Sequence, residues 1–247
     1  MGWLLSIVGA ACGLVLVVYG LSVWAARGIV RMDVRGLARE LDGDEAEAVL
    51  ARVESEAAFA EARGWPLVCV LQVDFPGATA HEVIWEIERG VRFFSASLRG
   101  LHGSMATFST LMRSRATHER VYVLTTQNRN SAFDLPALGV LAEAFVELDF
   151  ESLEGRHESA AQYLRHAGMC EQFGFSGSPL ELFIEAIEVQ AGWFRRRLVR
   201  QLLFPIWYLW AVMFAVGRSV EQRYGPRSRV IRRLRGEIMS MPESASP

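Results

Sequence analysis

The sequence predicts a single α/β domain with a mainly parallel sheet. A transmembrane helix precedes the domain, and a long helix follows it and leads into a second apolar, membrane-contacting segment. Three observations carry this prediction. The chain opens with 24 uncharged residues, from Trp3 to Ala26. Strand-like and helix-like segments alternate over residues 66–150, which is typical of parallel α/β domains. A second uncharged run, residues 202–217, lies between two groups of arginines.

The composition narrows the class of protein. The chain has 247 residues, 51% hydrophobic and 22% charged, and all 26 basic residues are arginine. Without lysine it can form neither a lysine Schiff base nor a G-x-x-x-x-G-K-[ST] phosphate-binding loop. Residues 193–247 hold 11 arginines against 3 acids, a charge of +8 beside −10 for the remainder. A cationic segment next to apolar sequence favours the lipid bilayer and its anionic headgroups as partners, and no nucleic acid.

The first uncharged run predicts a membrane helix. At 1.5 Å per residue, residues 3–26 can cross a bilayer core about 30 Å thick. Arginines follow this run at once and none precedes it. By the positive-inside rule, the predicted location is the cell membrane, as a bacterial inner membrane, with the main domain in the cytoplasm.

The elements of the domain follow from periodicity and capping. Residues 42–63 predict an amphipathic helix, and residues 67–73 a buried strand. The capping box Thr79–Glu82 predicts a helix to about residue 89. Further along, we expect strands at 91–98, 121–126 and 145–150, and helices at 104–113, 135–144 and 157–166.

A second capping box, Ser178–Glu181 with Pro179 at the first helical position, predicts a long helix leading toward the second apolar run. The predicted boundaries are 1–26 for the transmembrane helix, 27–65 for a basic flank and amphipathic helix, 66–178 for the α/β domain, 179–201 for the long helix, 202–217 for the second apolar segment, and 218–247 for an arginine-rich tail with a disordered end.

The candidate site lies in the loops that follow the strands. In an open parallel sheet these loops meet at one edge, so loops 74–78, 99–104 and 125–134 are expected together. A serine after glycine at a helix start favours Ser104 as nucleophile, with His102 or His118 as its base. The alternative is that Ser104 only caps the helix. The predicted catalytic residues are Ser104, His102 and Asp74, and the predicted ligand-binding residues are Arg99, Thr126, Asn128 and Arg129.

Metal and cofactor motifs are missing from the sequence. The five histidines have neither H-x₃-H nor H-E-x-x-H spacing, so no metal site is predicted. Gly100 and Gly103 do not make a dinucleotide fingerprint, and no cofactor is predicted.

The second apolar run has 16 uncharged residues, just short of a typical span. Its tryptophans fall in the middle, whereas spanning helices carry them at the ends. An interfacial helix is therefore favoured over a second crossing. The predicted membrane-surface residues are Arg195, Arg196, Arg197, Arg200, Arg218, Arg223, Trp207 and Trp210.

These features predict a membrane-anchored binding or assembly protein without its own catalysis, acting with a protein partner that the sequence does not identify. The alternative is a membrane-surface hydrolase or transferase that uses the polar loops, since a fold alone cannot decide function.

Overall fold

The computed structural model describes most of the chain between residues 38 and 238. The described residues are 19–20, 36, 38–75, 78–99, 103–128, 139–166, 168–195, 198–200, 202–203, 206 and 213–238. Of the predicted transmembrane helix, all but Tyr19 and Gly20 lie outside them. The predicted disordered end also lies outside them.

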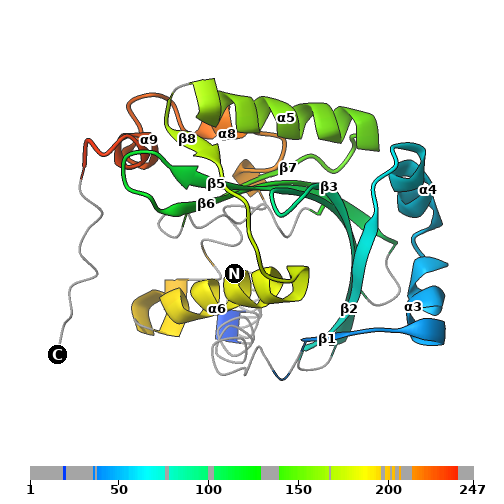
Figure 1. Cartoon of the computed structure of the whole chain (residues 1–247). Coiled ribbons are helices and arrows are strands. Elements are labelled where there is room, and N and C mark those ends of the chain that lie inside the picture. The colour runs from blue at the N-terminus through cyan, green and yellow to red at the C-terminus, as the bar shows by residue number, and fades with distance from the viewer. Residues whose placement is uncertain are drawn as a thin grey trace, which may run out of the picture.

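One curved sheet forms the centre of the fold (Figure 1). Its path runs in sequence order from β1 to β7, and β8 pairs with β5 beside that path. The predicted mainly parallel sheet is wrong, because every pairing is antiparallel except that of β6 with β7. The strands are β1 Ala38–Glu40, β2 Leu67–Phe75, β3 Ala78–Glu88, β4 Arg92–Arg99, β5 Met105–Ser114, β6 Arg120–Thr126, β7 Val140–Ala144 and β8 Cys170–Gln172.

Three predicted helices are wrong: residues 140–144 of the helix predicted over 135–144 form β7, and the other two, which account for the change in topology, are also strands. Of the helix predicted over residues 79–89, residues 79–88 belong to β3, which returns directly from β2 as a hairpin with Thr79 opposite Asp74. Residues 105–114 form β5, which pairs along β4 and β6. Helical spacing fits residues 104–113, but burial alternates at Ala106, Phe108 and Thr110 with half-buried residues between them. Alternation with a period of two is the strand pattern, and pairing on both sides satisfies the backbone.

Several element predictions are confirmed. The strands β2, β4 and β6 lie where apolar runs predicted them. The helix α6, Pro179–Arg195, begins with the predicted capping box: the Glu181 amide donates to Ser178 Oγ at 3.2 Å, and the Ser178 amide donates to Glu181 Oε2 at 3.0 Å. The predicted helix over residues 42–63 is two helices, α3 Gly43–Leu50 and α4 Glu54–Ala62.

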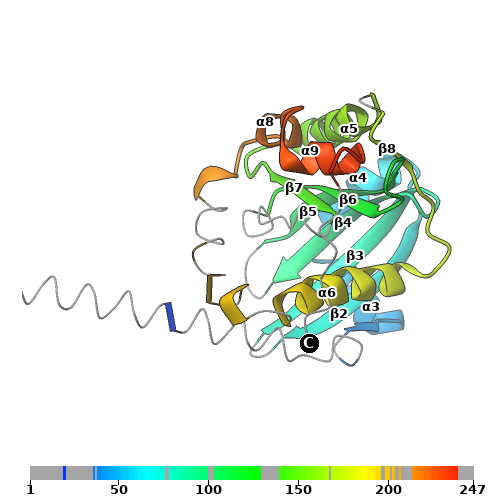
Figure 2. The ribbon, with the colours of Figure 1, turned by 90° about the vertical axis from the view of Figure 1, so that its left-hand side faces the viewer.

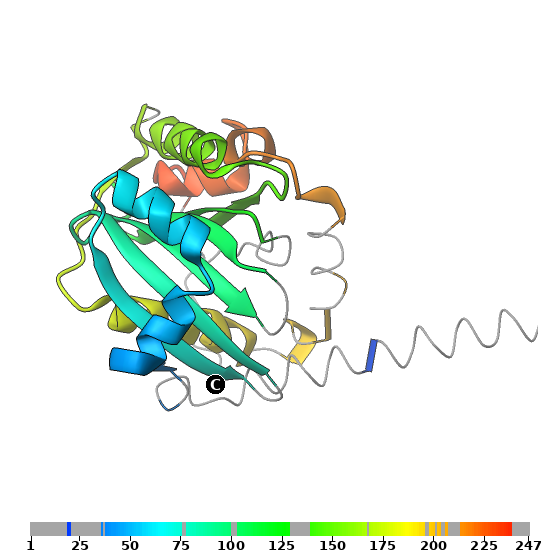
Figure 3. The same cartoon turned by 90° about the vertical axis from the view of Figure 1, so that its right-hand side faces the viewer.

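Helices cover both faces of the sheet. On the convex face lie α3, α4, α5 Phe150–His166, α8 Val220–Arg223 and α9 Arg229–Leu234 (Figures 1 and 3). On the concave face lies α6 (Figure 2). Residues 145–149, predicted as an edge strand, instead lead into α5.

The convex face holds the larger core. Phe94 and Phe108 are fully buried, with ring centroids 4.9 Å apart, and Phe59, Trp65 and Phe150 close around them. Offset and edge-on aromatic contacts of this kind add to the stabilisation from apolar burial. A second core joins Met112, Val121 and Leu141 of the sheet to α5, α8 and α9.

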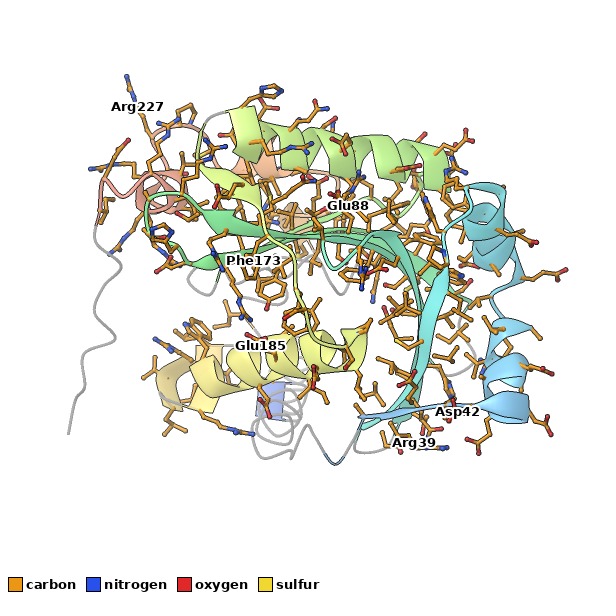
Figure 4. The ribbon with its side chains drawn as sticks, in the orientation of Figure 1. Arg39, Asp42, Glu88, Phe173, Glu185 and Arg227 are labelled. Atoms are coloured by element: carbon orange, nitrogen blue, oxygen red, sulfur yellow. The ribbon has the colours of Figure 1, made fainter. Side chains whose placement is uncertain are left out.

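The concave face is packed more lightly. Leu180, Leu182 and Phe183 of α6 contact a buried group on the first strands, namely Cys69, Leu71, Ile84 and Phe93. Further along α6, Glu185 pairs with Arg120 of β6 across the space between helix and sheet. Figure 4 shows Glu185 on the side of α6 that faces the sheet.

The membrane-spanning element of the predicted fold class also needs correction. Among the described residues, no helix is both long and apolar enough to cross a bilayer. The fold that the structure shows is a mixed α/β domain built on an eight-stranded, mostly antiparallel sheet.

Candidate functional site

The strands that lead into the three predicted loops, β2, β4 and β6, end on one side of the sheet. The reason is not the predicted one. In an antiparallel order, β2, β4 and β6 all run the same way, so their carboxyl ends share an edge. That edge is the left-hand side of the sheet in Figure 2. His102 and Arg129 lie outside the described residues, as does the side chain of Arg99.

Asp74 is bound within its own hairpin. Thr79 Oγ1 donates to its carboxylate at 2.9 Å, and Gln72 Nε2 donates at 3.0 Å. These hydrogen bonds, first that from Thr79 and then that from Gln72, lower the pKa of the Asp74 carboxyl below its usual 3.8. Asp74 therefore stays ionised at neutral pH and closes the β2–β3 hairpin.

Ser104 lies three strands away from Asp74. It directly precedes β5, and β3 and β4 lie between β5 and β2, a backbone separation of roughly 14 Å. No helix begins at Ser104, so the predicted helix amides that would stabilise an oxyanion are not there. His118 follows the far end of β5, about 33 Å along the strand. The structure does not bring these three residues together.

Thr126 and Asn128 are both buried where β6 ends. Thr126 Oγ1 lies 2.7 Å from Thr107 Oγ1 and accepts the Asn128 amide at 3.0 Å. Between them, Gln127 Nε2 donates to the Leu148 carbonyl at 2.7 Å. These bonds tie β6 to β5 and to the segment before α5.

The most exposed apolar side chains lie near this edge. Four of them, Leu198, Val199, Ile206 and Met213, are between 55% and 62% exposed, and Leu202 and Phe214 are also exposed. Only Leu67 and Val146 share this property elsewhere among the described residues. We call the exposed set the apolar segment: Leu198, Val199, Leu202, Ile206, Met213 and Phe214. Clustered apolar exposure marks an interaction surface.

Backbone contacts place the apolar segment against the sheet. The Gly217 amide donates to the Ala144 carbonyl at 2.8 Å, and Ala215 packs on Ala144 at the end of β7. Beside Ala144, the Phe145 amide donates to the Thr126 carbonyl at 2.9 Å. Tyr19 Oη donates to the Leu202 carbonyl. Residues 215–217, which directly follow the apolar segment, thus contact the sheet where β6 and β7 end.

Arginines flank the apolar segment, but they differ in setting. Arg195 and Arg218 are exposed. Arg200 donates to the Trp193 carbonyl at 2.7 Å and lies 4.2 Å over the Trp193 ring. Arg223 turns inward and donates to the Ala142 carbonyl of β7. The other predicted membrane-surface residues, Arg196, Arg197, Trp207 and Trp210, lie outside the described residues.

Sequence reasoning missed a chain of buried polar groups on the convex face. It joins Thr110 of β5, His157 of α5, Thr125 of β6 and Glu143 of β7, and each of the four is at most 2% exposed. The sequence signal that could have indicated it is Glu143, a charged residue inside the apolar run Val140–Ala144, where the sequence predicted the end of a helix. No substrate can reach groups buried this deeply, so this chain is not an active site.

Within the described ranges, no three side chains of the His, Cys, Asp or Glu type gather closely enough to hold an ion. Comparisons of the chain with protein-family models, with curated proteins and with solved structures find no match. The fold and the edge therefore define the protein only as a mixed α/β domain with an exposed apolar segment between arginines.

Proposed function

We propose that the protein is a non-catalytic binding or assembly protein that docks on a surface of anionic lipid headgroups through the apolar segment and its flanking arginines. The observation that carries the proposal is the clustering of exposed apolar side chains over residues 198–214, with Arg195 and Arg218 at its two ends. Apolar side chains with adjacent arginines suit an interface of acyl chains below anionic headgroups.

The candidate catalytic residues support the non-catalytic side of the proposal. Asp74 is engaged by Thr79 and Gln72, and β3 and β4 lie between its own strand, β2, and Ser104 at the start of β5. A nucleophile needs its base within hydrogen-bond reach. A protein partner and a cytoplasmic location of the domain stay predictions.

Vesicle flotation of the full chain tests the docking surface. The double change Met213→Ser and Phe214→Ser should weaken binding to every vesicle at least tenfold, because about 2 kcal/mol or more of apolar burial is lost. The double change Arg195→Gln and Arg218→Gln should weaken binding about thirtyfold, but only to vesicles containing phosphatidylglycerol, at about 1 kcal/mol per arginine.

Two matched controls lie away from the segment. Leu67→Ser removes an exposed apolar side chain from β2, and Arg115→Gln removes an exposed arginine beyond β5. Both should bind as the unchanged chain does. Equal binding by the Met213 and Phe214 variant would sink the docking proposal, and loss of a dimer in that variant would assign the segment to a second copy. Fluorophosphonate labelling that is lost in Ser104→Ala would favour the enzyme instead.

A further inference from the structure

The buried polar chain has continuous hydrogen bonds from end to end. Thr110 Oγ1 lies 2.7 Å from His157 Nε2, and His157 Nδ1 lies 3.0 Å from Thr125 Oγ1. Thr125 Oγ1 is 2.9 Å from Glu143 Oε1, and the Val220 amide donates to Glu143 Oε2 at 2.9 Å. The buried polar chain therefore runs from Thr110 of β5, through His157 in the middle of α5, to the first residue of α8.

With Glu143 ionised, the direction of every bond in the chain is determined. A carboxylate only accepts, so Thr125 uses its single proton to donate to Glu143. His157 Nδ1 must then carry a proton and donate to Thr125. Since His157 is neutral, Nε2 has no proton and accepts from Thr110.

The surroundings keep the His157 ring neutral. Burial first, and then the charges of Arg92 on β4 and Arg165 on α5, lower the pKa of His157 to about 3. Glu158 pairs with both of these arginines. One face of the His157 ring is covered by an apolar group, because the Phe108 ring stacks on it with 6.0 Å between the ring centroids.

Glu143 is the carboxyl group of the buried polar chain. Burial raises the pKa of its carboxyl above the usual 4.5, against the hydrogen bonds from Val220 and Thr125 and the charges of Arg156 on α5 and Arg223 on α8. The two groups that donate hydrogen bonds to Glu143, the Thr125 hydroxyl on β6 and the Val220 amide on α8, are uncharged.

We propose that the buried polar chain is a proton switch. One proton taken up by Glu143 reverses the three side-chain hydrogen bonds that link Thr110, His157, Thr125 and Glu143, and it moves the neutral His157 ring from its Nδ1–H to its Nε2–H tautomer. Protonated Glu143 donates to Thr125, Thr125 then donates to Nδ1, and Nε2–H donates to Thr110. This inference does not depend on lipid docking.

The protons balance along the chain. When a local opening admits solvent to this buried site, one proton from water enters at Thr110, whose own proton passes to Nε2. The Nδ1 proton passes to Thr125, and the Thr125 proton passes to Glu143. Each hydroxyl and the ring end with as many protons as before, and only Glu143 gains one.

The switch acts on the attachment of α8. A neutral carboxyl is a weaker acceptor than a carboxylate, because charged hydrogen bonds are roughly twice as strong. Proton uptake therefore weakens the bond from the Val220 amide, three residues after the Gly217–Ala144 contact that seats the apolar segment.

Nitrogen-15 NMR of the histidine side chains in the full chain tests the proposal. The unchanged chain at pH 8 should show His157 as the Nδ1–H tautomer. Glu143→Gln should show the Nε2–H tautomer at the same pH. The new amide must turn its oxygen to the Val220 N–H, so its NH₂ group donates to Thr125 as a protonated Glu143 would.

A titration of the unchanged chain from pH 8 to pH 4 gives a second measurement, which decides the question if Glu143→Gln does not fold. The His157 tautomer should change to Nε2–H as Glu143 protonates, while exchange protection of the Val220 amide falls. Thr125→Val removes the hydroxyl that links His157 to Glu143. In a protein with this substitution, neither a change of pH nor Glu143→Gln should change the His157 tautomer. A single tautomer under all conditions, or Nε2–H at pH 8 in the unchanged chain, would overturn the switch.

Discussion

At the scale of single residues, His157 has the least ordinary environment of the described residues. It is fully buried, yet both ring nitrogens have hydroxyl partners, so burial leaves no polar atom of the ring unsatisfied. Sequence alone places it on a helix and gives no sign of its partners. Thr110 and Thr125 lie 47 and 32 residues earlier in the chain, and only the sheet brings them to it.

The lowered pKa of His157 makes stability depend on pH. Between about pH 6.5 and 3 the unfolded chain binds a proton at this residue and the folded chain does not. Stability is therefore complete above about pH 6.5 and falls on acidification, by about 1.4 kcal/mol per pH unit. Urea unfolding at pH 7 and pH 5 should show a loss of about 2 kcal/mol that is absent in His157→Gln.

The comparison with the variant isolates His157. Glu143 affects the pH dependence of stability with the opposite sign, because its raised pKa lets the folded protein take up a proton before the unfolded one does. Glu143 is present both in the unchanged protein and in the His157→Gln variant. An equal loss of stability in both proteins would show that other groups set the acid sensitivity.

At the scale of elements, the turns decide which segments pair. Gly90 lies in the turn between β3 and β4 and has a φ of +66°. The segment that follows β8 contacts it through the backbone of Phe175. The Phe175 amide donates to the Gly90 carbonyl at 2.8 Å. An added Cβ at residue 90 would overlap the backbone oxygen of Phe175, whereas one at Gly43, with a φ of +53°, would meet open space.

These two glycines give a matched pair of variants. Gly43→Ala should lower the free energy of unfolding by about 1 kcal/mol, the cost of the left-handed conformation alone. Gly90→Ala should cost about 3 kcal/mol or more, since the backbone of residue 175 must also move. Thermal unfolding of both variants measures the difference. Equal losses would mean that the contact with Phe175 gives way easily.

At the scale of the whole molecule, the C-terminal segment belongs to the core. Its sequence predicted an arginine-rich tail, and Arg227 does point away from the fold in Figure 4. Even so, Val220, Ile231 and Leu234 are buried against β5, β6, β7 and α5. The arginines lie between these apolar positions, so one short segment supplies both core and charged surface.

Two substitutions on α9 separate these roles. Ile231→Ala should lower the free energy of unfolding by about 3 kcal/mol, because it leaves a cavity beneath the helix. Arg229→Ala removes an exposed charge two residues away and should cost less than about 0.5 kcal/mol. Urea unfolding curves of the two variants test this. A small loss for Ile231→Ala would mean that α9 is not part of the cooperative core.

The sequence by itself determined the local features of this protein. Apolar runs predicted β2, β4 and β6, and the Ser178–Glu181 capping box predicted the start of α6. Each of these signals lies within a few residues of what it specifies, so no partner segment is needed to recognise it.

The tertiary structure decided the rest. The capping and spacing of residues 79–89 and 104–113 fit helices, but residues 79–88 and 105–113 are strands because β2, β4 and β6 lie on either side to form their hydrogen bonds. The same pairing set Asp74 and Ser104 apart and closed the polar chain around His157. Hydrogen bonds and burial between segments far apart in the chain cannot be predicted from the spacing of residues within one segment.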